Sequence, residues 1–382
     1  MKMTKIYKPN FSKAEMKAYE LLKSSKANDF PIKVKKLKKL FPNLKIRKYT
    51  WLANKRGWTI EEVCNFTDSE DGCCWYIRET NEYMILYNDT IENEGRIRWT
   101  IAHEIGHFIL KHNEVTQKTI LARYSLTNSE YEVYEKEANC FARTLLAPPN
   151  IVSELNPTDP SIISDIFNIS YEAATNVFNY FQNGLRMSFS YSKEHFVIKM
   201  FKRFIFKYRH GKTCSDCFHF FIDKDGHFCP VCGQSNLIKG EGGNMFYSKI
   251  ELNELLMPTE CPKCKNGNVG GDYCQVCGVY QINRCTGFRE EDHNQFQYQQ
   301  HITWHTHDEG CGNVLEGDAR FCSKCGSTSI YYEENLLKNW EVEMKEKEEL
   351  VDPFDESLFN SPKKQMVVVN SSKDISDEDL PF

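Results

Sequence analysis

Two histidines and a glutamate at short spacing are the residues of this chain best suited to chemistry. His103, Glu104 and His107 form a His-Glu-x-x-His pattern among the apolar residues of 98–110. On a helix, residues four apart lie on one face, so the two imidazoles converge on one point. Imidazole nitrogens suit Zn²⁺, and a catalytic zinc site usually combines three protein ligands with one position for water. Zinc lowers the pKa of bound water from about 15.7 toward about 7, and Glu104 is placed to act as general base.

A third zinc ligand is expected on a second helix, within residues 134–149. Glu135 and Asn139 lie four apart on one face of that helix. We therefore assign Glu135 as the third ligand and Asn139 as the residue that holds a ligand histidine by a hydrogen bond. Glu137 is the rival ligand, but it is two residues further along the helix and points elsewhere. The helical assignment rests on the spacing of Ala138, Phe141, Ala142, Leu145 and Leu146, and on the stop at Pro148-Pro149.

The two segments together carry a family resemblance. The first reads Arg98-x-Thr-x-Ala-His-Glu-x-Gly-His107, and the second reads Glu135-x-Glu-Ala-Asn-x-Phe-Ala142 followed by Leu145-Leu-x-Pro148. This arrangement resembles the ImmA/IrrE family of zinc metallopeptidases over about residues 10–185. The resemblance implies a gluzincin-type site of two histidines and one glutamate. It also implies endopeptidase action, in that family often on DNA-binding repressors of mobile elements.

The surrounding elements predict an α+β domain with a small sheet beside the active-site helices. Apolar periodicity predicts helices over residues 13–24 and 31–41 and a short helix over 59–63, with strands over 44–49, 75–77 and 83–87. An edge strand of this sheet is a candidate platform for an extended peptide. Residues 159–182 resemble a helix-turn-helix, but the second helix has no Lys or Arg to meet phosphates, so we expect packing or substrate docking.

Residues 196–212 alternate aromatic with basic side chains. The pattern is typical of a platform for single-stranded nucleic acid. It is also typical of a half-buried strand, and we favour a strand that leads into the next domain.

Most of the sixteen cysteines fall into Cys-x-x-Cys pairs. Such pairs form turns that aim two thiolates at one tetrahedral zinc ion. Two such pairs around one zinc ion form a small module known as a zinc ribbon. Metal binding contributes on the order of 10 kcal/mol to the folding free energy of such a module. The first predicted ribbon uses Cys214, Cys217, Cys229 and Cys232, and the second uses Cys261, Cys264, Cys274 and Cys277.

A third ribbon is predicted with an altered first pair. Cys322 and Cys325 form its second pair, and Cys311 belongs to its first, but Asp308 stands where another cysteine is expected. We assign His307 as the fourth ligand, with His305 behind it, and keep a metal-poor ribbon as the alternative. Cys285 is left without a partner. We therefore expect one catalytic and two or three structural Zn²⁺ ions.

The last segment of the sequence is charged and then rich in Ser and Asp, and we expect residues 352–382 to be disordered. It resembles the acidic tip of bacterial single-stranded DNA-binding proteins, which docks on genome-maintenance enzymes. A basic rim would meet the acids and an apolar hole would take an aromatic ring. The predicted partner-binding residues are Asp377, Glu378, Asp379, Leu380, Pro381 and Phe382.

Composition places few limits on partners. The 382 residues carry a formal net charge of −5, with Lys and Arg concentrated in residues 1–60. We expect no membrane segment, and a cytoplasmic protein whose paired cysteines bind metal. The expected domains are a metallopeptidase domain (1–190), a connecting β segment (191–212), ribbons (213–240, 258–282 and 303–330) and a charged linker with an acidic tail (331–382).

These patterns lead to one main hypothesis and two rivals. The main hypothesis is a zinc endopeptidase that cleaves a cytosolic protein, such as a repressor, and is delivered by its ribbons and tail. The rivals are a non-catalytic zinc-ribbon adaptor and a nucleic-acid-binding protein that uses the ribbons. Glu104 argues against the adaptor, because a structural site does not need a base beside its ligands.

Overall fold

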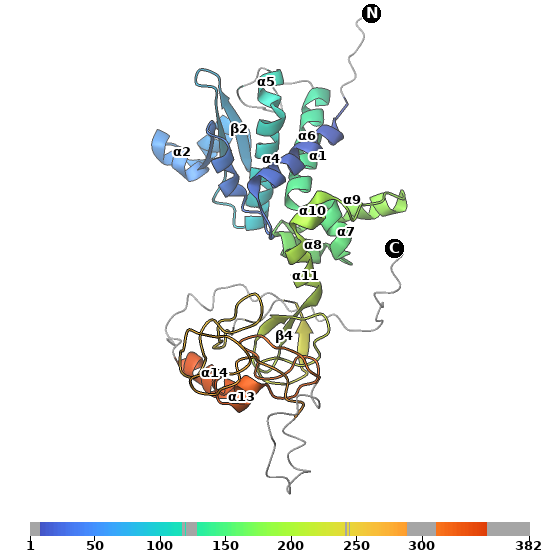
Figure 1. The fold of residues 1–382 in the computed structure, drawn as a ribbon. Coiled ribbons are helices and arrows are strands. Elements are labelled where there is room, and N and C mark those ends of the chain that lie inside the picture. The colour runs from blue at the N-terminus through green and yellow to red at the C-terminus, as the bar shows by residue number, and fades with distance from the viewer. Residues whose placement is uncertain are drawn as a thin grey trace, which may run out of the picture. The chain divides into compact units, whose positions relative to one another are not determined.

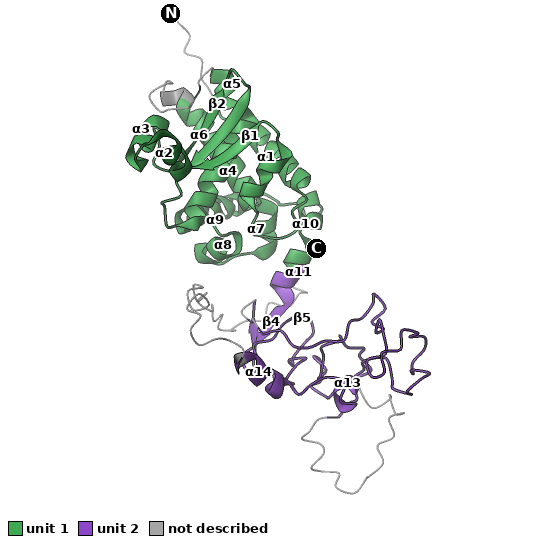
Figure 2. Cartoon of the chain, turned by 90° about the vertical axis from the view of Figure 1, so that its left-hand side faces the viewer, with its two compact units in different colours: residues 1–205 green, residues 206–382 purple. Residues whose placement is uncertain are grey.

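The computed structural model describes residues 8–116, 119, 128–240, 243, 245–288 and 311–349. Contacts divide the chain into two compact units, unit 1 (residues 1–205) and unit 2 (residues 206–382), coloured separately in Figure 2. Each unit is described on its own. In the part of the chain that the structure describes, no helix has the length and apolar character needed to cross a membrane.

Unit 1 combines a three-stranded sheet with helices (Figure 1). The strand order is β1-β3-β2, with β1 parallel and β2 antiparallel to β3. The strands are β1 (Leu44–Lys48), β2 (Gly72–Ile77) and β3 (Glu82–Tyr87). The helices are α1 (Phe11–Ser25), η1 (Val34–Leu40), α2 (Tyr49–Arg56), α3 (Ile60–Thr67), α4 (Glu94–Leu110), α5 (His112–Thr116), α6 (Asn128–Leu146), α7 (Pro149–Leu155), α8 (Pro160–Phe167), α9 (Tyr171–Arg186), α10 (Phe196–Met200) and α11 (Lys202–His210), the last of which crosses into unit 2.

The sheet is covered by helices because its strands bury side chains on both faces. Leu86 and Cys73 pack in one apolar cluster with Tyr49 and Leu52 of α2 and Val63 of α3. Successive side chains of a strand point to opposite faces, so Cys74 lies on the other face from Cys73. Helix α4 packs against β2 and β3 and against α6. It is therefore the central element of unit 1.

Helices α4 and α6 approach closely at Gly106. A Cβ atom at Gly106 would lie 3.3 Å from the Cα atom of Ala138 and 3.2 Å from the Phe141 ring. Gly106 costs helix propensity of about 1 kcal/mol relative to alanine. The close approach accounts for glycine here. It also brings Glu135 and Asn139 of α6 to His103 of α4.

A buried arginine ties α4 to the helical pair α8–α9. Arg98 is 7% exposed, and its guanidinium donates to the carbonyl oxygens of Asn168 (2.8 Å) and Ile32 (2.9 Å). Asn168 lies in the turn that joins α8 to α9. This turn therefore packs on α4.

Two expectations about secondary structure were wrong. The helix expected over residues 31–41 is the 3₁₀ helix η1, in which Val34 and Leu37 are buried at the three-residue spacing of that helix. The strand expected within residues 191–212 is mostly helical, as α10 and α11, and only Gly211–Cys214 is a strand. Its buried residues Val197, Phe201 and Ile205 recur every four residues, which is helical spacing.

In its described residues, unit 2 contains little regular structure and is organised around cysteines. It has a three-stranded sheet of order β5-β4-β6, in which both pairs are antiparallel. Its elements are β4 (Gly211–Cys214), β5 (Phe220–Ile222), β6 (Leu237–Lys239), α13 (Ile330–Glu333) and α14 (Trp340–Glu349). Trp340 and Met344 of α14 pack on the apolar cluster formed by the first four cysteines.

Candidate metal centre and catalytic base

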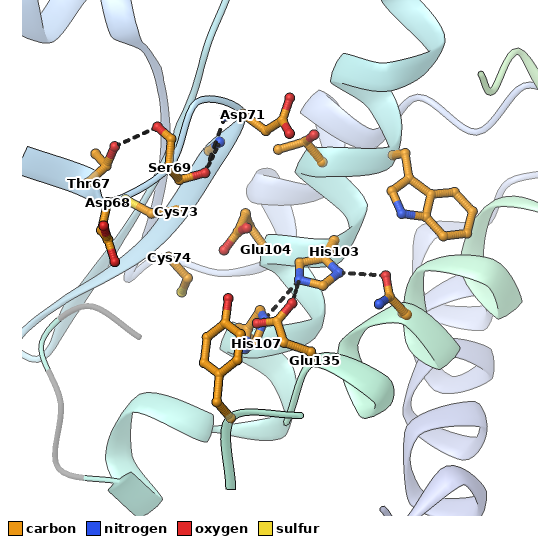
Figure 3. A pocket seen from close by; sticks show the side chains of 15 residues that line it. Thr67, Asp68, Ser69, Asp71, Cys73, Cys74, His103, Glu104, His107 and Glu135 are labelled. Carbon is orange, nitrogen blue, oxygen red and sulfur yellow. Dashed lines mark hydrogen bonds and ion pairs between the residues drawn. The ribbon is translucent and has the colours of Figure 1, made fainter. Parts of the chain in front are cut away.

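Three side chains from α4 and α6 converge on one point in unit 1 (Figure 3). The Nε2 atoms of His103 and His107 are 3.0 Å apart. The Glu135 carboxylate oxygens lie 3.2 Å from Nε2 of His103 and 3.4 Å from Nε2 of His107. Donor atoms about 2.1 Å from a tetrahedral ion lie about 3.4 Å from one another. The donor set and its spacing therefore fit a zinc ion.

Asn139 of α6 lies beside His103. Its Oδ1 is 3.1 Å from Nδ1 of His103. With Oδ1 as the acceptor, His103 carries its proton on Nδ1 and directs the lone pair of Nε2 toward the other ligands. The rival residue Glu137 does point elsewhere, since its carboxylate accepts from His112 (3.0 Å) and from the Asn10 backbone N–H (2.6 Å).

Glu104 lies beside the three ligand side chains and faces β2 (Figure 3). It is 8% exposed, and the backbone N–H of Cys74 donates to its carboxylate. Burial raises the pKa of Glu104 to about 7. A buried carboxylate with a pKa near neutrality is suited to accept and return a proton.

The charges of the ligand side chains are set by burial and by their mutual contacts. Burial opposes the charge of His103, but hydrogen bonding to Glu135 outweighs it and raises the His103 pKa to about 9. Burial lowers the pKa of His107 to about 4. Burial opposes ionisation of Glu135, but its hydrogen bonds with His103 and His107 hold the Glu135 pKa far below the usual range.

One cavity lies at this cluster and a second cavity adjoins it. The first, of about 280 Å³, is lined by the three ligand side chains and Glu104. The second, of about 670 Å³, is lined by residues of α4, α6 and α9, including Arg96, Arg143 and Asn176. Both cavities are lined by Asp71, Trp99, Thr100 and Asn139, so they adjoin each other at these residues.

The edge strand β2 borders the first cavity, but its backbone is already engaged. The Cys74 N–H donates to Glu104 and the Cys74 carbonyl accepts from Asn113 Nδ2 at 3.1 Å. The Tyr76 N–H donates to the Thr119 carbonyl at 2.8 Å. A peptide that added to this edge would have to displace these partners, so the cleft offers the more accessible path.

In unit 2, twelve cysteines form three groups of four, each with ligand atoms within 4.8 Å of one another. Sulfur–sulfur distances include 3.4 Å between Cys214 and Cys232 and 3.6 Å between Cys261 and Cys277. Zinc–sulfur bonds of about 2.3 Å place thiolates of a tetrahedral site about 3.8 Å apart, whereas a disulfide bond is about 2.05 Å long. The geometry therefore fits zinc. The first two groups contain the cysteines that the sequence paired: Cys214, Cys217, Cys229, Cys232 and Cys261, Cys264, Cys274, Cys277.

The third group differs from the prediction. Cys311, Cys322 and Cys325 are joined by Cys285, which the sequence left over, and the Cys285 and Cys325 sulfurs are 3.4 Å apart. Cys285 thus takes the fourth place that was assigned to His307, which lies outside the described residues. The physical reason is a β-bridge between Arg284 and Val314, which brings Cys285 next to Cys311.

The predicted tail residues Asp377, Glu378, Asp379, Leu380, Pro381 and Phe382 also lie outside the described residues. Within the site, sequence reasoning missed His112. It is 2% exposed and its Nδ1 is 2.9 Å from Nδ1 of His107. The available signal was its position just beyond the end of α4, close to a ligand histidine.

Comparison with known proteins addresses the part of the chain that holds this site. A search of curated proteins finds no match. Residues 66–178 match the family model Peptidase_M78, described as an IrrE N-terminal-like domain. The matched residues include all of α4 and α6, and therefore His103, Glu104, His107 and Glu135. The match supports an ImmA/IrrE domain with a zinc-metallopeptidase-like fold in this part of the chain.

Proposed function

We propose that this chain is a zinc-dependent endopeptidase. The observation that carries the proposal is the position of Glu104, a buried carboxylate with a pKa near 7, beside the His103–His107–Glu135 cluster in an open cleft. A structural metal site has closed coordination and needs no such base. The match to a metallopeptidase family model supports the same conclusion.

The chain's own residues divide the work of peptide hydrolysis. His103, His107 and Glu135 would hold the zinc ion, and Asn139 orients His103. The metal, when bound, supplies Lewis acidity that polarises the scissile carbonyl and acidifies water. The Glu104 carboxylate takes the proton of the attacking water and passes it to the leaving amine nitrogen. Hydrogen bonding from the Cys74 N–H holds Glu104 in place for both steps.

The two adjoining cavities support a proposal for how a protein substrate is held. A peptide bond at the metal centre leaves chain on both sides, and the second cavity is large enough for several side chains. Its wall combines the cations Arg96 and Arg143 with apolar residues such as Trp99 and Val177. We therefore propose that a segment of the substrate polypeptide occupies this cavity next to the scissile bond.

We further propose that unit 2 and the acidic tail select the substrate. The four-cysteine groups fit closed structural sites, so their contribution is binding to protein or to nucleic acid. By resemblance, the substrate is a DNA-binding repressor of a phage or another mobile element. The tail would dock on genome-maintenance proteins and connect cleavage to DNA damage.

The decisive experiment compares wild type with Glu104→Gln in cells. New protein N-termini are identified by mass spectrometry across the proteome, with and without DNA damage. Glutamine keeps the shape of the side chain and removes the base, so we expect cleavages to vanish while zinc content stays unchanged. Glu94→Gln, an exposed residue of the same helix, is the matched control and should retain every cleavage.

Identical N-termini in wild type and Glu104→Gln, with zinc bound at His103 and His107, would contradict the peptidase. That result would favour a non-catalytic adaptor. Nucleic-acid binding through unit 2 is tested separately, since a steep loss of affinity with rising salt would indicate phosphate contacts.

A further inference from the structure

The Nδ1 side of His107 contacts a hydrogen-bonded series of buried side chains that take no part in the proposed reaction. His107 and His112 are 3% and 2% exposed, and Glu137 is 8% exposed. Nδ1 of His107 lies 2.9 Å from Nδ1 of His112, and Nε2 of His112 lies 3.0 Å from Glu137 Oε2. The other Glu137 oxygen accepts from the Asn10 backbone N–H at 2.6 Å.

The backbone explains how residue 112 reaches residue 107. Helix α4 ends at Leu110, and Lys111 adopts a left-handed conformation with φ of 62°. This turn stops the helix and starts α5 at His112, whose ring then packs against His107 with centroids 5.0 Å apart. The Tyr134 ring, 4.8 Å from the His112 ring, holds it from the α6 side.

Hydrogen-bonding rules fix the protons along this chain. A carboxylate is only an acceptor, so neutral His112 carries its proton on Nε2 and donates it to Glu137. Its Nδ1 is then an acceptor. The short Nδ1–Nδ1 contact therefore needs the proton of His107 on Nδ1, which leaves the lone pair of Nε2 directed at His103 and Glu135.

We propose that His112 and Glu137 are positioning residues that hold His107 in its Nδ1-protonated form, with Nε2 ready to bind the metal. The Nε2 lone pair of His107 is therefore set before a metal arrives. Asn139 fixes the ring orientation of His103 in a comparable way, with its Oδ1 3.1 Å from Nδ1 of His103. The inference rests on the metal site of the proposed function, and it adds two residues and a specific tautomer to that site.

Substitutions at position 112 separate a hydrogen-bonding role from a packing role. His112→Phe keeps a planar ring against Tyr134 but removes the acceptor for His107. His112→Asn loses the ring but places an amide oxygen near the former position of Nδ1, so that His107 can still donate. The tautomer model predicts a zinc affinity about 10–100-fold weaker for His112→Phe, the range typical of lost outer hydrogen bonds, and a smaller loss for His112→Asn.

A substitution at position 137 tests the far end of the chain. Glu137 accepts two N–H donors with two oxygens, whereas glutamine offers one oxygen and an NH₂ group. In Glu137→Gln, either His112 or the Asn10 N–H would face an NH₂ group in place of an acceptor. The alternative is that the tautomers of His112 and His107 both reverse, which protonates Nε2 of His107. We expect a similar 10–100-fold loss of zinc affinity. Glu132→Gln, an exposed glutamate of the same helix, is the matched control and should bind zinc as wild type does.

The measurement is zinc transfer from the full-length protein to a chromophoric chelator, after assignment of the open site with His103→Ala. Zinc in the four-cysteine groups serves as an internal control for folding. Nitrogen-15 chemical shifts of labelled histidines in protein stripped of its open-site zinc read the His107 tautomer directly.

The outcomes distinguish this inference from the proposed function. If His112→Phe binds zinc as tightly as wild type, or more tightly than His112→Asn, the role of His112 is packing and the inference is wrong. An Nε2-protonated His107 in the metal-free wild type would also overturn it. Failure of wild type to bind zinc at His103 and His107 would instead remove the proposed function.

Discussion

At the scale of single residues, Cys285 shows how a ligand can be supplied from a distant segment. Residues 286–310 separate it from Cys311, yet the two join Cys322 and Cys325 in one group. The Cys285 backbone N–H donates to the Asn313 carbonyl at 3.0 Å, so the segments are held together by backbone bonds. Cys285 is also 3% exposed, as a structural ligand should be.

This placement predicts different effects for two substitutions. Cys285→Ser should remove one zinc ion per chain, because a serine hydroxyl does not replace a thiolate in a four-cysteine site. His307→Ala should leave the zinc content unchanged. Metal analysis of the purified full-length variants checks both. Loss of zinc in His307→Ala with retention in Cys285→Ser would restore the ligand set predicted from sequence.

Ligands related by helical periodicity could be predicted, and ligands related by tertiary contacts could not. His103 with His107, and Glu135 with Asn139, are four apart on single helices, so local geometry is enough to place each pair. His112 reaches His107 only through the left-handed turn at Lys111. Cys285 depends on a β-bridge across a long segment. Neither feature has a short sequence signature.

At the scale of elements, the packing of α4 against α6 sets the distance between the two sources of ligands. Within residues 191–212, aromatic and basic residues alternate, and this alternation suggested a strand. The buried residues Val197, Phe201 and Ile205 instead recur every four residues, which is helical spacing. Buried residues, and not the whole pattern, determine the periodicity. Helix α6 buries Ala138, Phe141, Ala142 and Leu145 at helical spacing, and helices were predicted at both α4 and α6.

Gly106→Ala should destabilise unit 1 although alanine has the higher helix propensity. The added Cβ would lie 3.3 Å from the Ala138 backbone, which cannot move without shifting α6. Overpacking of this kind costs about 1–3 kcal/mol, against a propensity gain of about 1 kcal/mol. We expect a lower unfolding temperature and weaker zinc binding at the His103–His107–Glu135 cluster. Greater stability together with unchanged zinc affinity would show that the two helices have room to adjust.

The second cavity predicts that substitutions on α9 lower peptidase activity only at positions that line the cavity. Asn176 lines the cavity, whereas Asn179 on the same helix does not. A tryptophan at position 176 should fill the space proposed for the substrate and lower kcat/KM for a protein substrate at least tenfold, with zinc affinity unchanged. Asn179→Trp, the matched control, should retain wild-type kinetics. Equal activity of both variants would exclude this cavity from the substrate path.

At the scale of the whole molecule, the first and third four-cysteine groups of unit 2 are not independent modules joined by a linker. The Phe321 ring, just before Cys322, lies within 2.9 Å of the Cβ position of Gly233, and the Phe228 ring, just before Cys229, lies within 3.0 Å of that of Gly326. The first and third groups therefore pack on each other reciprocally. Arg320, fully buried, pairs with Glu343 of α14 at 2.8 Å, and α14 covers the first group.

This interlocking predicts that loss of one metal site weakens another. Phe228 and Pro230, on either side of Cys229, contact the third group, and the Pro230 carbonyl accepts from the Arg320 and Phe321 N–H groups. Cys229→Ser should disrupt metal binding in the first group and so weaken these contacts. Contacting sites usually couple by about 0.5–3 kcal/mol, which corresponds to about 2- to 160-fold in the opening equilibrium. Alkylation of Cys322 and Cys325, followed residue by residue by mass spectrometry, should therefore accelerate in Cys229→Ser. Cys274→Ser in the second group is the control and should affect these two cysteines less, since that group does not share the reciprocal phenylalanine–glycine contacts. Wild-type alkylation rates at Cys322 and Cys325 in Cys229→Ser would mean that each group folds around its metal alone, and that unit 2 is an array of separate modules.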